Sequence, residues 1–180
     1  ISLYFTCVIL ALVSYLLSLA ARMSANREGL FALYQAASSI NEALTLQEVF
    51  DRARSFTHSL LHEDFTWLAL PTGDESGELA IACTWLGDGV DLERASAHVA
   101  AINAGLRDRE PEGQYIWTRG QDGSSPAYFG WVVVTALHLG KQFVGEFGLA
   151  SHYAPDEVTG DKLQLLAVLS SHLALAVDNA

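Results

Sequence analysis

The stretch "WVVVTALHLGKQFVGEFGLAS", residues 131–151, decides the fold. It contains two apolar, strand-like runs, residues 131–139 and 142–151, with the dipeptide Gly140-Lys141 between them. A connection of this length joins neighbouring antiparallel strands. The stretch therefore predicts a β-hairpin.

The second strand of this hairpin carries one acid, Glu146, between glycines. Strict alternation gives the strand a bulky face and a small face. The bulky face holds Phe143, Gly145, Phe147 and Leu149, and the small face holds Val144, Glu146, Gly148 and Ala150. Because an unpaired buried carboxylate is costly, Glu146 is expected to be hydrated, to line a cavity or to find a donor. The candidate donors are Arg119, Tyr115 and Trp117.

The rest of the chain predicts helices and strands around this hairpin. Apolar residues recur every three or four positions from Leu30 to Leu44, and a second helix starts after Thr45, an N-cap with Glu48 three residues later. The further elements are strands at 65–71, 78–87 and 113–120, and helices at 91–108 and 154–180. The order α-α-β-β-α-β-β-β-α predicts an α+β domain, with an antiparallel sheet of about five to six strands and helices on both sides.

Residues 1–21 form an uncharged apolar run that ends at Arg22. A helix of this length spans about 30 Å, which matches the hydrocarbon core of a bilayer. We therefore expect a transmembrane helix over 1–21, a juxtamembrane linker over 22–29 and a sensory domain over 30–180. Small residues at 18–20 leave a signal peptide as the alternative. Arginines after the run favour an inner-membrane protein with a cytoplasmic soluble domain.

Charge and cysteine content exclude several classes of function. Ten basic and 21 acidic residues give a net charge of −11, which disfavours nucleic-acid binding. The two cysteines, Cys7 and Cys83, lie far apart and form neither a disulfide framework nor a zinc spacing. Likewise the sequence contains no nucleophile elbow, no phosphate loop and no Ser-His-Asp pattern, so no catalytic residues are predicted.

The sequence resembles the GAF domain over roughly residues 28–180. The similarity is carried by "VVVTALHLGKQFVGEFGLASHYAPDE" (132–157), by "LLAVLSSHLALAVDNA" (165–180) and by "LFALYQAASSINEALTLQEVFDRA" (30–53). Thr135 departs from the pattern, since many GAF domains have proline before the turn. PAS-like sensor folds are the main alternative.

The resemblance implies a ligand pocket between the sheet and the mid-domain helix, with walls from residues 83–133. The candidate ligand-binding residues, including the acid of the hairpin, are Trp85, Tyr115, Trp117, Arg119, Phe129, Trp131 and Glu146. Aromatic walls with a few polar groups suit a small organic ligand. A filled core with the arginines at the surface is the equal alternative. No cofactor can be named.

Other ligand classes of GAF domains find weak support in the sequence. Haem would need a pocket histidine, for which His98 and His138 are candidates, and a bilin would need Cys83, which has the pattern of a core residue. The only match to a cyclic-nucleotide signature is Asp156-Glu157, which helix-start acids explain equally well. His58 and His62 have a zinc-compatible spacing, but they lack a second ligand pair, so no metal is predicted.

The resemblance also implies a role in signalling. We expect a GAF sensory and dimerisation domain of a bacterial membrane protein, a sensor histidine kinase whose catalytic domain would lie beyond residue 180. Its N- and C-terminal helices would pack against those of a second copy as a homodimer, because the helix at 154–180 is apolar on nearly every side. The alternatives are a ligand-free dimerisation spacer and a regulatory domain of a cyclic-di-GMP signalling protein. A methionine sulfoxide reductase is disfavoured because Cys83 stands alone.

Overall fold

The computed structural model describes residues 29–73, 78–106, 114–118, 128–153 and 158–180. Its centre is a five-stranded sheet in the order β2-β1-β5-β4-β3, in which all neighbouring strands are antiparallel. The strands are β1 (Phe65–Pro71), β2 (Leu79–Leu86), β3 (Gln114–Thr118), β4 (Trp131–Leu139) and β5 (Gln142–Ser151). The predicted hairpin is thus β4 and β5, and β5 lies at the centre of the sheet.

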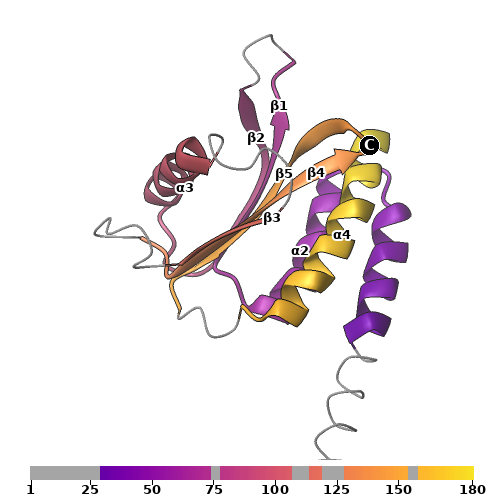
Figure 1. The fold of residues 1–180 in the computed structure, drawn as a ribbon, viewed down its shortest axis with the longest axis horizontal. Helices are drawn as coiled ribbons and strands as arrows, with labels where there is room; N and C mark the ends of the chain where they lie inside the picture. Colours follow the sequence, from indigo (N-terminus) through magenta and orange to yellow (C-terminus); the bar gives the residue numbers. More distant parts are fainter. Residues whose placement is uncertain (1–28, 74–77, 107–113, 119–127, 154–157) are drawn as a thin grey trace, which may run out of the picture.

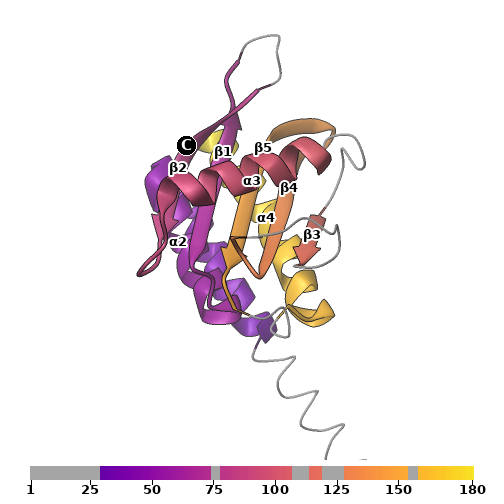
Figure 2. The ribbon, with the colours of Figure 1, turned by 90° about the vertical axis from the view of Figure 1, so that its left-hand side faces the viewer.

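Helices cover both faces of this sheet (Figure 1). On one face lie the first helix (residues 29–41), α2 (Leu46–Leu61) and α4 (Gly160–Asn179). On the other face α3 (Leu92–Leu106) crosses the strands, as Figure 2 shows. The prediction of an α+β domain with helices on both sides is confirmed.

Strand alternation divides the interior into two cores. The core under α2 and α4, called the helix-bundle face, includes Leu68, Trp131 and Phe147 together with helix residues such as Phe50 and Leu169. The other core, called the α3 face, is smaller. It consists of Phe65, Trp67, Ala69, Ala95, Val99, Phe129, Val132, Val134 and Ala150. Each strand therefore presents one set of residues to the bundle and the other to α3.

The predicted alternation of β5 fails at its start. The register between β4 and β5 shifts where Leu137 pairs with Gly145 and His138 pairs with Phe143, so Val144 is an extra residue. Such a bulge turns a side chain to the other face. Val144 accordingly packs in the helix-bundle core with Phe147, while Phe143 is 38% exposed. The prediction that Val144 shares the face of Glu146 is wrong.

The predicted cap of α2 is confirmed. Thr45 has an extended backbone, and its hydroxyl accepts a hydrogen bond from the backbone N–H of Glu48. The Glu48 carboxylate accepts from the N–H of Leu44 at 2.8 Å, one residue before the N-cap. Together these bonds satisfy backbone donors that the helix start leaves open.

The predicted membrane helix, residues 1–21, lies outside the described residues. Within the part of the chain that the structure describes, no helix is both long and apolar enough to cross a bilayer.

Candidate functional site

The α3 face holds a cluster of aromatic rings next to several polar groups. Phe65 stacks on Trp67 at 5.3 Å between ring centroids and on Phe129 at 5.9 Å. His98 of α3 reaches Phe129 at 5.9 Å. This face is where the resemblance placed a ligand pocket, and Phe129 is the predicted site residue that it buries completely.

Trp67 fills the space that the small residues of β5 leave on this face. A Cβ placed on Gly148, its partner across the strands, would lie 1.9 Å from the Cζ2 atom of Trp67 and 2.1 Å from its Cε2 atom. The indole ring therefore lies directly over Gly148. The sequence indicated room at Gly148, and the structure shows that a neighbouring strand occupies it.

The indole nitrogen of Trp67 is a buried polar atom of the α3 face. Trp67 is 1% exposed, and its Nε1 has no hydrogen-bond partner among the described residues. An indole N–H is a donor only, and a buried donor without an acceptor costs about 1–3 kcal/mol. An acceptor atom of a bound molecule would remove this cost.

Glu146 lies on the same face, one row further along the sheet. It pairs with Ala69 of β1 and Ala136 of β4, and it is half-buried. Trp67 pairs with Gly148, so Glu146 and Trp67 are diagonal neighbours across β1 and β5. Glu146 also has an interaction partner in the structure. It is therefore neither fully solvent-exposed nor fully buried, and its role in binding stays a prediction.

The other predicted site residues do not gather on one face. Trp85 lies against α2, where the Arg54 guanidinium is 4.3 Å from its ring centroid and His58 is at 5.3 Å. Trp131 is buried in the helix-bundle core. These two tryptophans therefore lie on the opposite face of the sheet from Glu146, because their strand positions have the other parity.

Three predicted site residues are described in part or not at all. Tyr115 and Trp117 belong to β3, where they pair with Val134 and Val132, two residues of the α3-face core. Arg119 lies outside the described residues. The part these three residues play in binding stays a prediction.

Asp64 anchors one end of the α3 face. Its Oδ2 accepts a hydrogen bond from the Ser151 hydroxyl at 2.7 Å and from the His152 backbone N–H at 2.9 Å, and it lies 3.2 Å from His152 Nδ1. The His152 ring contacts Tyr128 and Phe129. The serine donates to the aspartate and not to the histidine, so these three residues do not form a nucleophilic triad. The contact between Asp64 and Ser151 was not predicted from the sequence, because the two residues are 87 positions apart.

The histidines and Cys83 do not form a cofactor site with one another. No group of three or more His, Cys, Asp or Glu within the described ranges is arranged to hold a metal ion. His138 lies at the end of β4 against Phe143, and Asp156-Glu157 lies outside the described residues. Cys83 is buried, and burial, with a smaller contribution from Asp51, raises the pKa of its thiol. A protonated thiol is a poor nucleophile, which fits a core residue.

A groove lies on the far side of the bundle, between the first helix and α4. Its volume is about 390 Å³, and it is lined by Leu30, Leu33, Tyr34, Ala37, Ser38, Asn41, Val168 and His172. Tyr34 is 74% exposed and Leu30 is 56% exposed. Val168 and Leu175 of α4 are also exposed, so the described residues leave part of this apolar helix uncovered.

The comparisons with known proteins agree with this architecture. No protein-family model matches the sequence, and no curated protein is significantly similar to it. A GAF domain assigned to a sensor histidine kinase from Pseudomonas syringae pv. tomato superposes with a TM-score of 0.62, covering 89% of this chain and 92% of its own, at 18% identity.

Two further structures extend the similarity to other proteins. The GAF domain of an Acinetobacter phosphoenolpyruvate-protein phosphotransferase has a TM-score of 0.62, covers 85% of this chain and 94% of its own, and is 13% identical. The GAF domain of a two-component sensor histidine kinase from Bacillus halodurans has a TM-score of 0.53, covers 76% of this chain and 96% of its own, and is 18% identical. The chain has the GAF fold.

Proposed function

We propose that the protein is the sensory GAF domain of a membrane-anchored bacterial signalling protein. The full protein would be a sensor histidine kinase. The GAF domain would bind a small organic molecule on the α3 face. The observation that supports ligand binding is the buried Trp67 N–H, which lies within an aromatic cluster and has no acceptor among the described residues. The kinase and its membrane context are supported by two similar domains from sensor histidine kinases and by the apolar run at 1–21. The soluble domain would face the cytoplasm.

Removal of the indole N–H tests this site. A thermal-shift screen of the full chain against cyclic nucleotides, haem, bilins and small metabolites should find a ligand that raises the melting temperature. Trp67→Phe keeps an aromatic ring but removes the hydrogen-bond donor. It should lower the affinity for that ligand by about tenfold, which corresponds to the loss of one hydrogen bond. Trp85→Phe, on the opposite face, should bind as the wild type does. Equal affinities for the wild type and Trp67→Phe would contradict the proposed contact.

A ligand-free dimerisation spacer is the second candidate. It is favoured by the position of Trp67, whose ring already occupies the space above Gly148. In that case none of the compounds would raise the melting temperature of the wild type. Both candidates require the helices to form a dimer.

We propose that a second copy of this chain covers the groove between the first helix and α4. Apolar residues that include Tyr34, Val168 and Leu175 remain exposed along these two helices. Burial of such side chains is worth roughly 25 cal/mol for each Å² removed from water. A dimer through these helices would join the end of the predicted membrane segment to the C-terminal helix.

A charge placed in the groove tests the dimer. Tyr34→Glu should convert the 180-residue chain in detergent from dimer to monomer, because two carboxylates would be desolvated at the interface. Light scattering measures the mass. Tyr153→Glu is the matched control, since Tyr153 is 68% exposed and lies two residues beyond the end of β5, outside the two helices of the proposed interface. A wild-type chain that is monomeric at high concentration would contradict the proposal.

A further inference from the structure

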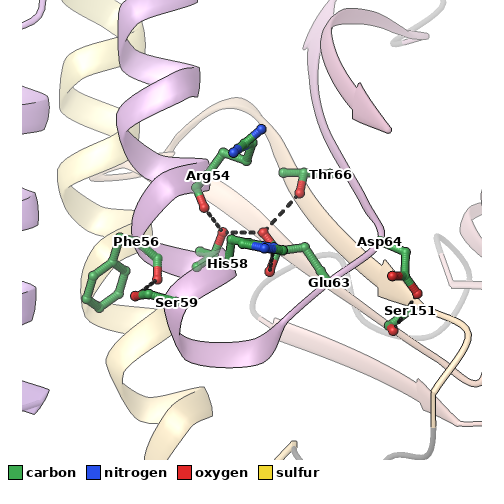
Figure 3. A network of polar contacts seen from close by, with 9 residues as sticks. Arg54, Phe56, His58, Ser59, Glu63, Asp64, Thr66 and Ser151 are labelled. Atoms are coloured by element: carbon green, nitrogen blue, oxygen red, sulfur yellow. Dashed lines mark hydrogen bonds and ion pairs between the residues drawn. The ribbon is translucent and has the colours of Figure 1, made fainter. Parts of the chain in front are cut away.

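A buried glutamate lies where α2 leads into β1. Glu63 is 1% exposed, and its side chain points between the last turns of α2 and the start of β1 (Figure 3). The chain reaches this position through His62, which ends α2 in the left-handed conformation with φ 51°. That conformation reverses the chain direction and turns Glu63 inward. The ligand site and the dimer proposed above do not involve this residue.

The two carboxylate oxygens of Glu63 have different surroundings. Oε1 accepts hydrogen bonds from the hydroxyl of Thr57 at 2.9 Å and from that of Thr66 at 3.2 Å. Oε2 is buried with no hydrogen-bond partner in the described part of the chain and lies 3.8 Å from His58 Nδ1, which is likewise buried without such a partner. The His58 side chain as a whole is 44% exposed. His58 thus stands between a buried carboxyl group and solvent.

The Thr57 hydroxyl has one proton and two acceptors. It lies 3.1 Å from the carbonyl oxygen of Arg54 and 2.9 Å from Glu63 Oε1. When Glu63 is protonated at Oε1, the acid can donate to Thr57, and Thr57 can donate to Arg54. When Glu63 is ionised, Thr57 must donate to Glu63 instead. The hydrogen bonds of the last turns of α2 therefore depend on the protonation of Glu63.

Few charges face this carboxyl group. From α2 these are His58 and Arg54, whose guanidinium stacks over Trp85. β2 contains no charged residue between Leu79 and Leu86. The residue of β1 that contacts the carboxyl group, Thr66, is uncharged. The carboxylate of Asp64 is turned to Ser151 (Figure 3). Among the described residues, His58 is therefore the titratable side chain that pairs with the Glu63 carboxyl group.

We propose that Glu63 and His58 form a proton-operated joint between α2 and the sheet. In one state the acid is neutral and donates to Thr57. In the other state the acid has released its proton to water past the half-exposed His58 ring, and Oε2 of the resulting carboxylate accepts a hydrogen bond from His58 Nδ1–H. This hydrogen bond closes the 3.8 Å gap between Oε2 and Nδ1. Because the His58 ring also packs edge-on against Trp85 at 5.3 Å, this closure moves the contact between α2 and β2.

The pKa of Glu63 agrees with this geometry. Burial raises the pKa above its ordinary value of 4.5, and this outweighs the lowering by the hydrogen bond from the backbone of Glu63, by the Thr57 hydroxyl and by the charge of His58. Since the folded protein holds this proton more tightly than the unfolded chain, the contribution of Glu63 to stability is fully present below pH 4.5 and is lost as the pH rises through the raised pKa.

Carbon-13 NMR of the full chain with labelled glutamate tests the joint. The side-chain carboxyl signal absent from Glu63→Gln is assigned to Glu63, and its midpoint should lie above 4.5. His58→Gln should raise this midpoint further, because it removes the charge that lowers the pKa of Glu63. His62→Asn is the matched control, since it keeps a residue that tolerates the left-handed conformation and should leave the midpoint unchanged.

Trp85 provides the readout of movement. The part of the tryptophan fluorescence that Trp85→Phe removes should change with the same midpoint as the Glu63 signal, and this change should be lost in His58→Gln, which removes the ring that contacts Trp85. If Glu63→Gln does not fold, the His58→Gln shift and the fluorescence still decide the outcome. A Glu63 midpoint at or below 4.5, no effect of His58→Gln, or a Trp85 signal independent of Glu63 would each overturn the proposal.

Discussion

Gly148→Ala is expected to lower the free energy of unfolding by about 3 kcal/mol, a large effect for the addition of one methyl group. The new Cβ would lie 1.9 Å from the Cζ2 atom of Trp67, and the ring itself is 1% exposed and packed against Phe65. The indole cannot move without disturbing the α3-face core. Urea unfolding of the full chain, followed by circular dichroism, measures the loss.

A second substitution shows whether the clash is with this ring. Trp67→Leu alone creates a cavity and should cost about 3 kcal/mol, but the double variant with Gly148→Ala should be more stable than the sum of the two by about 1–3 kcal/mol. Gly160→Ala is the control, because outside the adjacent backbone of its own helix no heavy atom lies within 4 Å of a Cβ at that position. Strict additivity of the two changes would show that Trp67 is not the obstacle.

Leu173→Ala and Leu175→Ala, two residues apart on α4, are expected to have very different effects. Leu173 is 1% exposed in the helix-bundle core, whereas Leu175 is 42% exposed. Leu173→Ala should therefore destabilise the fold by about 2–5 kcal/mol through lost burial and a new cavity. Leu175→Ala should change the stability of the monomer by less than about 1 kcal/mol.

The same pair separates folding from association. Urea unfolding at low protein concentration reports the fold, and light scattering at high concentration reports the proposed dimer. Leu175→Ala should weaken the dimer while it leaves the unfolding of the monomer nearly unchanged. If the two variants were equally destabilised at low concentration, the exposed side of α4 would be part of the monomer core.

Local patterns in the sequence predicted much of the fold. The helix cap at Thr45 depends on residues three positions apart, and the β4–β5 hairpin depends on two apolar runs around a short turn. Both arise from neighbouring residues, whose preferences act within one turn of a helix or one strand pair. The resemblance added the GAF fold, and the structural comparisons agree with it.

The candidate site could be predicted only in part. Phe129 and Glu146 lie on the expected α3 face, whereas Trp85 and Trp131 lie on the bundle face. Aromatic content alone cannot assign a face, because a step of one residue along a strand reverses the side chain. The missed residue, Trp67, lies in the strand predicted at residues 65–71, outside the segment 83–133 that was expected to form the pocket walls. Its signal would have been the buried N–H, which becomes apparent only when the surrounding acceptors are known.

The sequence by itself determined the elements, their order and the hairpin that organises the sheet, because these depend on contacts between neighbours in the chain. Only the tertiary structure decided which residues that are far apart in the sequence come into contact. It brought Trp67 over Gly148, joined Asp64 to Ser151 and enclosed Glu63 with His58 and the two threonines. Burial and hydrogen bonding set the energy of these groups, and both are properties of the packed molecule.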